Sequence, residues 1–231
     1  MKYICLCLLF LFSLTGVAQK NIHHRWNTQL QKYVSETGQV DYQSWQKDQA
    51  PLIAYLNTLA QFPPQEEDSK NQKLAYWINA YNALTVLLIL ENYPLNSIKD
   101  IQSPWDQNVF QIGDKNYSLG DIEHKILRKM DEPRIHFAIN CASGSCPKLL
   151  NLAYQEKQLE HQLVEVTRDF LRDPTKNYLL KDRLELSKIF LWFGRDFGTK
   201  KELLQFISTY SGIKLDQPKI DYKPYDWKLN E

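Results

Sequence analysis

Residues 70–92 are the feature that most constrains how this chain can fold. One side of this segment carries apolar and aromatic side chains at helical spacing, namely Leu74, Trp77, Ile78, Tyr81, Leu84 and Leu88. The remaining sides carry Val86, Leu87, Ile89 and Leu90. A helix that is apolar on every side is normally buried, because no face of it favours water. The segment therefore predicts a central helix around which the rest of the chain packs.

Asn79 and Asn82 lie one turn apart on this predicted helix. Buried amides need hydrogen-bond partners, so both side chains are expected to bind a neighbouring segment. They could clamp the backbone of a nearby loop, or they could line a pocket and orient a catalytic group. The clamp is the simpler of the two interpretations.

Periodicity predicts further helices and short strands along the rest of the chain. Amphipathic helices are expected at about 25–36, 50–61, 119–130, 155–172 and 199–210. Two hairpins are expected, one at 109–117 around a Gly-Asp-Lys turn and one at 178–186 around a Lys-Asp turn.

Residues 134–140 alternate in a way that is typical of a half-buried strand. Ile135, Phe137 and Ile139 would share one face, with His136, Ala138 and Asn140 on the other. The helices and strand pairs do not follow the regular βαβ rhythm of a parallel sheet. The pattern therefore predicts an α+β fold: a helix-rich single domain with a buried central helix and short antiparallel strands and hairpins.

The first 18 residues have the pattern of a secretory signal peptide. Lys2 precedes an apolar run at residues 3–14, and small residues lead up to Ala18. The apolar run is shorter than the roughly 20 residues that a membrane-spanning helix needs. We therefore expect cleavage before Gln19, export to the periplasm or the extracellular space, and no transmembrane anchor afterwards.

Composition narrows the classes of partner. The chain is 43% hydrophobic and 13% aromatic, which suits a packed interior, and its 28 basic and 27 acidic side chains give a net charge of +1. Without a basic cluster there is no reason to expect nucleic acid as a partner. No cofactor is expected.

Cys5 and Cys7 would leave with the signal peptide, so the exported chain would keep only Cys141 and Cys146. Disulfides persist outside the cytoplasm, and these two cysteines permit one bridge. A loop this short would gain about 2 kcal/mol from the bridge on the chain-entropy view. Its expected effect is on local geometry more than on the whole fold.

Residues 136–147 form the best chemical candidate. Cys146 or Cys141 could act as a nucleophile, His136 as its base and Asn140 as an orienting group, with Ser145 nearby in a flexible loop. Strand alternation, however, would place Cys141 on the face opposite His136. Thiol catalysis, a disulfide and inert packing therefore remain alternatives.

Glu123 and His124 are weaker candidates for a pocket or orienting role. Adjacent residues on a helix point about 100° apart, so the two are not expected to pair directly. A solvated helix face or a satisfied core histidine is the simpler interpretation. His136, Cys141 and Cys146 could also ligate zinc, but the segment lacks the tight Cys-x2-Cys knuckle, and we expect no metal site.

Five blocks resemble the DUF547 family, a domain of unknown function, in its exported bacterial form. They are WINAYN at 77–82, IEHKILR at 122–128, HFAINCASGSCP at 136–147, Ser187 with Trp192 and DFG at 196–198, and YDWKLN at 225–230. The resemblance covers about residues 40–230. It implies an N-terminal helical lead-in at 19–39 and a family domain at 40–231, and it assigns no activity.

Two function classes follow from these residues. The first is a thiol- and histidine-dependent hydrolase or acyl transferase that acts on amide or ester bonds in the cell envelope. The second is a non-catalytic envelope module with a structural disulfide, which binds a small molecule, a peptide or a glycan. In either case we expect residues 136–147 to line the principal pocket, with Asn79 and Asn82 facing it. The polar and aromatic strip at 225–230 could bind a ligand, although pinning of the chain end is the simpler role.

Overall fold

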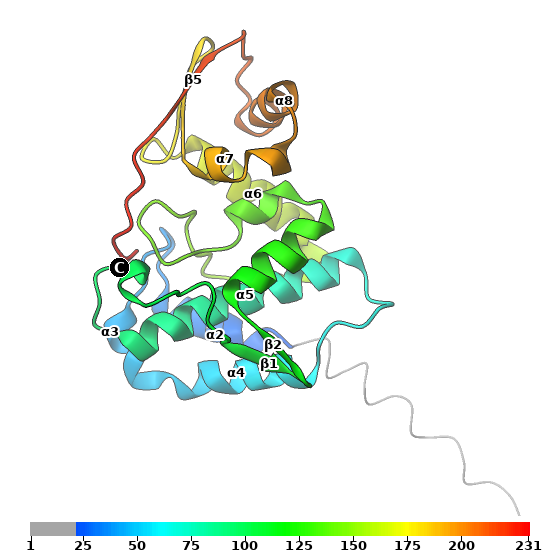
Figure 1. The fold of residues 1–231 in the computed structure, drawn as a ribbon, viewed down its shortest axis with the longest axis vertical. Helices are drawn as coiled ribbons and strands as arrows, with labels where there is room; N and C mark the ends of the chain where they lie inside the picture. Colours follow the sequence, from blue (N-terminus) through cyan, green and yellow to red (C-terminus); the bar gives the residue numbers. More distant parts are fainter. Residues whose placement is uncertain (1–21) are drawn as a thin grey trace, which may run out of the picture.

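The computed structural model describes residues 22–231, and the predicted signal peptide lies outside the described residues. Helix α5 (Lys70–Asn92) runs through the middle of the molecule, as predicted (Figure 1). The Ser69 hydroxyl accepts a hydrogen bond from the Gln72 amide at 3.0 Å and so caps the helix start. By length and composition α5 could cross a membrane, but 89% of its most apolar window is buried inside the protein. It is the central helix of the core.

The N-terminal helices pack against one side of α5. Trp26 stacks on both Trp45 and Tyr55, with ring centroids 5.8 Å apart in each case. The predicted lead-in therefore belongs to the same core as the following residues. The elements here are α2 (His24–Tyr33), α3 (Tyr42–Trp45), η2 (Gln46–Asp48) and α4 (Ala50–Gln61).

The C-terminal helices build the other side of the domain. Phe137, Phe170, Phe190 and Phe197 meet there in one aromatic cluster, with centroid distances from 4.9 to 6.4 Å. The cluster joins this side to the same hydrophobic core. The elements are η7 (Glu156–Gln158), α6 (Leu159–Arg172), α7 (Ile189–Trp192), η8 (Gly194–Phe197) and α8 (Lys200–Ser211).

Both predicted hairpins are present. Strands β1 (Phe110–Ile112) and β2 (Lys115–Tyr117) pair antiparallel, as do β3 (Tyr178–Leu179) and β4 (Arg183–Leu186). Strand β5 (Lys219–Tyr222) was not predicted, and it pairs parallel to β4. The described chain is thus a helix-rich α+β single domain with two small sheets.

The predicted helix at 119–130 is helical but irregular. It is wound as a π turn, η4 (Asp121–Ile126), followed by the 3-10 turn η5 (Leu127–Met130). A further 3-10 turn, η3 (Ile98–Asp100), lies in the connection after α5. Single π turns within helices are frequent at functional sites, because they re-aim side chains.

The strand predicted at 134–140 is wrong, because its first half is the 3-10 helix η6 (Pro133–Phe137). The Glu132 carboxylate accepts a hydrogen bond from the Arg134 amide at 3.2 Å, and Pro133 occupies the first turn, where its missing N–H costs nothing. Every residue from 134 to 140 is buried, so the alternating sequence pattern does not correspond to one exposed face and one buried face. The segment crosses the core without a partner strand.

Candidate functional site

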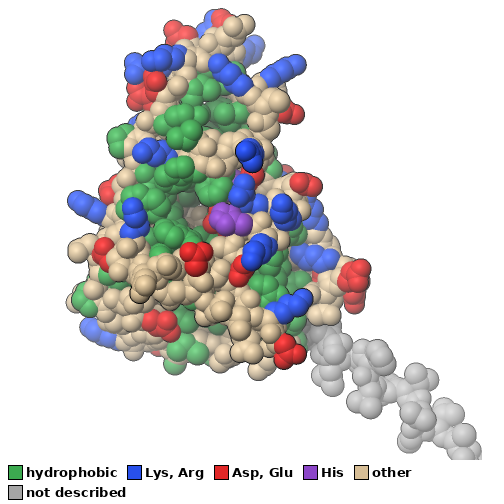
Figure 2. Space-filling view, in the orientation of Figure 1, with side chains coloured by type: hydrophobic (Ala, Val, Ile, Leu, Met, Phe, Trp, Pro, Cys, Tyr) green, Lys and Arg blue, Asp and Glu red, His purple; other side chains and the backbone are tan. Residues whose placement is uncertain are grey.

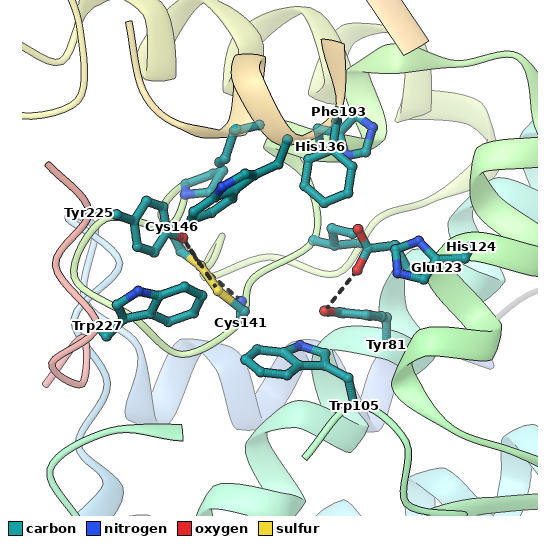
Figure 3. Close-up of a pocket in the computed structure, with 14 residues that line it drawn as sticks. Tyr81, Trp105, Glu123, His124, His136, Cys141, Cys146, Phe193, Tyr225 and Trp227 are labelled. Atoms are coloured by element: carbon teal, nitrogen blue, oxygen red, sulfur yellow. Dashed lines mark hydrogen bonds between the residues drawn. A yellow bond between two sulfur atoms is a disulfide. The ribbon is translucent and has the colours of Figure 1, made fainter. Parts of the chain in front are cut away.

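A pocket of about 260 Å³ opens between the π turn η4, the loop after η6, helix α7 and the C-terminal segment (Figure 3). Hydrophobic side chains run down the middle of the face shown in Figure 2, and a histidine with charged neighbours lies beside them. The pocket brings together residues that lie far apart in the sequence, from Tyr81 to Trp227. It is lined by Tyr81, Trp105, Glu123, His124, His136, Ile139, Cys141, Cys146, Pro147, Ile189, Trp192, Phe193, Tyr225 and Trp227.

Aromatic rings form most of the wall. Trp227 is the central ring, with centroid distances of 4.6 Å to Tyr225, 5.8 Å to Trp192 and 5.9 Å to Trp105. Trp192 remains 45% exposed, which places it at the mouth of the pocket. One of these ring pairs is edge to face, one is tilted and one is stacked, and rings in mutual contact keep one another in place, so the pocket is largely preformed.

Glu123 supplies a carboxyl group to this apolar pocket. The Tyr81 hydroxyl donates to its Oε2 atom at 3.4 Å, and Figure 3 shows the two groups next to each other on one side of the pocket. Within residues 22–231 no other hydrogen bond reaches this carboxyl group, and the residue is only 6% exposed. Burial raises the pKa of Glu123 to about 7, although Arg128 and Tyr81 act in the opposite direction.

His136 pairs with Asp196 instead of with a cysteine. Its Nε2 atom lies 2.8 Å from Asp196 Oδ2, and its ring stacks on Phe193 at 4.2 Å. Arg128 donates to both oxygens of the same carboxylate, at 2.6 and 2.8 Å. Burial lowers the pKa of His136 to about 4 despite the opposing effect of Asp196, so the imidazole is neutral at pH 7.

His124 also lies at the edge of the pocket. Its Nδ1 atom is 3.2 Å from Nη1 of Arg128. Two effects lower the pKa of His124: the larger is burial, and the second is the positive charge of Arg128. The π turn thus presents both Glu123 and His124 to the pocket without a direct pair between them, as the sequence predicted.

Cys141 and Cys146 form a disulfide, one of the alternatives considered for them, and it is part of the pocket wall. The Cys146 sulfur lies 3.1 Å from the Cys141 backbone N–H, 3.3 Å from the Ser143 hydroxyl and 3.2 Å from the Tyr225 hydroxyl. In this state neither cysteine has a thiol available as a nucleophile.

Asn140 shapes the loop that carries the disulfide and does not orient His136. Its Nδ2 group donates to the Pro147 carbonyl at 2.7 Å, and its Oδ1 atom accepts from the Ala142 amide at 2.8 Å. Ala142 has a φ of 59°, a left-handed conformation that this hydrogen bond helps to hold. Ser145 accepts from the Asp226 amide at 2.8 Å and so ties the loop to the C-terminal segment, but it does not line the pocket.

Asn79 and Asn82 act as backbone clamps. Asn79 donates to the Tyr154 carbonyl at 2.8 Å and accepts from its amide at 3.0 Å. Asn82 donates to the Ala138 carbonyl at 2.9 Å and accepts from the Asn140 amide at 2.8 Å. Neither residue lines the pocket, contrary to the expectation that both would face it. Asn82 acts on the pocket indirectly, because it fixes the backbone between His136 and Cys141.

The C-terminal segment pins the chain end and also contributes side chains to the pocket. Asn230 pins the chain end, since its Oδ1 atom accepts from the Tyr42 hydroxyl at 2.8 Å and its carbonyl accepts from the Val40 amide at 2.9 Å. Tyr225 and Trp227 face the pocket instead.

Several site residues were not identified from the sequence, namely Tyr81, Trp105, Arg128, Phe193 and Asp196. Asp196 lies in one of the family blocks, as do Tyr81 and Arg128, so the motifs held a signal that could have found them. Their partners come from distant segments, and His136 with Asp196 spans 60 positions. In the described residues no group of three His, Cys, Asp or Glu side chains is placed to hold a metal ion.

Residues 65–171 match the family described as "Protein of unknown function, DUF547". The matched part contains α5, the π turn, the disulfide loop and all of α6 except its last residue, and it supports the resemblance carried by the sequence blocks. Trp192, Tyr225 and Trp227 lie beyond it. Searches among curated proteins and among solved structures gave no match. The family description assigns no activity, so a function has to be argued from the pocket.

Proposed function

We propose that this protein is an exported, non-catalytic module of the cell envelope that binds a small ligand, or one group of a peptide or glycan, in the aromatic pocket. The observation that carries the proposal is the disulfide between Cys141 and Cys146 in the pocket wall. It removes both thiols from chemistry while it holds the wall in shape. A preformed apolar pocket with few polar groups is the usual form of a small-ligand site.

The contacts of His136 also favour binding over thiol catalysis. A histidine that activates a cysteine must lie within hydrogen-bond reach of the sulfur. Here the Nε2 atom is used by Asp196, and the sulfur of Cys146 instead lies near the Tyr225 and Ser143 hydroxyls. His136 therefore supports Phe193 and the pocket wall.

Export is part of the same proposal. The signal-like residues 1–18 and a disulfide that would persist outside the cytoplasm both support it. Intact-mass measurement of protein from the envelope fraction should show a chain that begins at Gln19, give or take two residues. Retention of residues 1–18 would contradict export.

Binding can be measured through the three tryptophans of the pocket, Trp105, Trp192 and Trp227. Amine, peptide and glycan fragments should change the tryptophan fluorescence at saturable concentrations. Trp192→Ala should weaken the response, whereas Leu191→Ala, a neighbouring exposed position outside the pocket, should not. A panel without any saturable response would count against the proposed function.

A second candidate is the thiol-dependent hydrolase, and one observation favours it. His136, Cys141 and Cys146 all line the same pocket, and Asp196 holds the imidazole as a triad acid would. Reduction of the disulfide by a thiol reagent would free the nucleophile. Ester hydrolysis that appears only after reduction, and that disappears in both Cys146→Ser and His136→Ala, would favour this candidate over simple binding.

A further inference from the structure

The pocket combines one poorly solvated carboxyl group with a wall of aromatic rings. Glu123 is 6% exposed as a residue, and the one hydrogen bond that its carboxyl group receives from a described residue is the long 3.4 Å contact from the Tyr81 hydroxyl. A carboxylate normally accepts several hydrogen bonds when it is buried, because desolvation is costly. Glu123 therefore has unused acceptor capacity that is directed into the cavity (Figure 3).

The basic groups around the pocket do not satisfy this carboxyl. Arg128 makes a two-pronged ion pair with Asp196, and its guanidinium lies over the Phe193 ring at 5.3 Å. His124 and His136 both have lowered pKa values and are neutral at pH 7. With Arg128 and Asp196 cancelling each other, the inner pocket carries a negative charge whenever Glu123 is ionised.

The rings offer the second half of a cation site. The faces of Trp and Tyr rings attract cations within about 6 Å of their centroids, and several rings around one carboxylate give the aromatic-cage arrangement that binds alkylated ammonium groups. Trp105, Trp192, Tyr225 and Trp227 lie close together around the cavity. Lys99, which does not line the pocket, already lies over the Trp227 ring at 5.2 Å, so this ring takes part in one cation–π contact within the protein.

We propose that the pocket selects an organic cation, an alkylated ammonium group that is held between the Glu123 carboxylate and the rings of Trp105, Trp192, Tyr225 and Trp227. This inference rests on the proposed binding function and gives it a ligand class. The cation would displace water that an apolar wall holds only weakly, and it would supply the counter-charge that Glu123 lacks. A neutral sugar could stack on the same rings, but it would leave the buried carboxylate without a counter-charge.

The test compares choline with its uncharged carbon isostere, which serves as the matched control. Tryptophan fluorescence and calorimetry measure the binding of each compound to the full exported chain. We expect choline to bind about tenfold or more tightly than the isostere, because only the charged probe gains the carboxylate and cation–π attraction. Glu123→Gln should remove this preference and leave the weak binding of the isostere unchanged. Glu91→Gln, an exposed position outside the pocket, is the control and should keep the preference.

The pH dependence gives an independent measurement. The groups that face Glu123 are Tyr81, His124, Arg128, His136, Asp196 and Tyr225. Burial raises the pKa of Glu123 to about 7, whereas it lowers the pKa of His136 to about 4 and that of His124 below its ordinary 6.5. Choline affinity should therefore rise between pH 6 and pH 8 as the carboxyl ionises, while affinity for the isostere stays level. Choline binding at pH 7 should also release protons, which makes the measured heat depend on the buffer.

The possible outcomes separate the two proposals. Equal binding of choline and its isostere, or binding of a neutral oligosaccharide alone, would overturn the cation inference and leave the binding function standing. Binding of none of these compounds would count against both. If Glu123→Gln does not fold, Trp192→Ala serves as the second variant, and it should lower choline affinity by a larger factor than isostere affinity.

Discussion

His136 and Asp196 are joined by a 2.8 Å hydrogen bond between Nε2 and Oδ2, which links η6 to η8 across 60 positions of the chain. Arg128 holds the same carboxylate through two short hydrogen bonds. The three side chains form a fixed frame behind Phe193, whose ring stacks on His136. The frame sets the position of one pocket wall and joins the segments that build it.

Asp196→Asn tests this frame. The substitution keeps the shape of the side chain but removes the charge that Arg128 pairs with, so we expect the free energy of unfolding at pH 7 to fall by about 1 to 3 kcal/mol. Urea denaturation measures the change. Asp182→Asn, at an exposed turn, is the control, and an equally small effect of both variants would show that the frame adds little stability.

His136 also predicts how stability depends on pH. Its pKa is about 4 in the folded protein, below the ordinary value of 6.5, so the unfolded chain binds more protons between these values. Stability should therefore fall as the pH drops from about 6.5 to 4, by up to about 3 kcal/mol for this group. Burial also lowers the pKa of His23 to about 4, so His23 should add to the same loss of stability at low pH. His136→Asn should flatten the slope measured by denaturation at several pH values, whereas His161→Asn, at an exposed position, should leave it unchanged.

Glu123 should act in the opposite direction. In the folded protein burial raises its pKa to about 7, above the ordinary 4.5. Protonated Glu123 therefore stabilises the folded state at low pH, and this stabilisation is lost as the pH rises through 7. Glu123→Gln imitates the protonated side chain at every pH. Relative to the natural protein, the variant should therefore gain about 2 to 3 kcal/mol between pH 5 and pH 8. Thermal melts at the two pH values measure this gain, and a constant difference would mean that Glu123 is already ionised at pH 5.

The sequence predicted the parts of the fold that depend on local pattern. Helix α5 was identifiable because it is apolar on all sides, and both hairpins were identifiable from turn residues between β-prone segments. Strand β5 has only four residues of mixed exposure, and its parallel pairing with β4 depends on the intervening helix α8. No local signal could have indicated that pairing.

The site was predictable only in part, for a similar reason. His136, Cys141 and Cys146 line a pocket, as expected for residues 136–147, and the disulfide was one of the alternatives that the two cysteines left open. The clamp preferred for Asn79 and Asn82 matches the structure, but neither residue faces the pocket, and Asn140 holds its own loop instead of orienting His136. An amide on a buried segment can reach backbone as readily as it can reach a ligand. Asp196 was not recognised as the partner of His136, since residues this far apart meet only through tertiary packing.

The two amides on α5 should matter to stability. Asn79→Ala would leave the backbone amide and carbonyl of Tyr154 without partners, and Asn82→Ala would do the same to Asn140 and Ala138. Each variant should lower the free energy of unfolding by about 1 to 3 kcal/mol. Asn57→Ala, on the exposed side of α4, is the matched control. Melts that do not separate Asn79→Ala and Asn82→Ala from this control would contradict the clamp.

The disulfide should contribute modestly to stability and more strongly to the pocket. The bridge closes a loop across a sequence separation of five, which corresponds to about 2 kcal/mol on the chain-entropy view. The double substitution Cys141→Ser with Cys146→Ser should lower the free energy of unfolding by about that amount. The loop should stay in place, because Ser145 still binds the Asp226 amide and Asn140 still binds Pro147. Tyr225, however, would lose both sulfur contacts, so ligand affinity should fall more than stability predicts. Fluorescence titration beside urea denaturation separates the two effects, and unchanged affinity in the double variant would mean that the bridge does not shape the pocket.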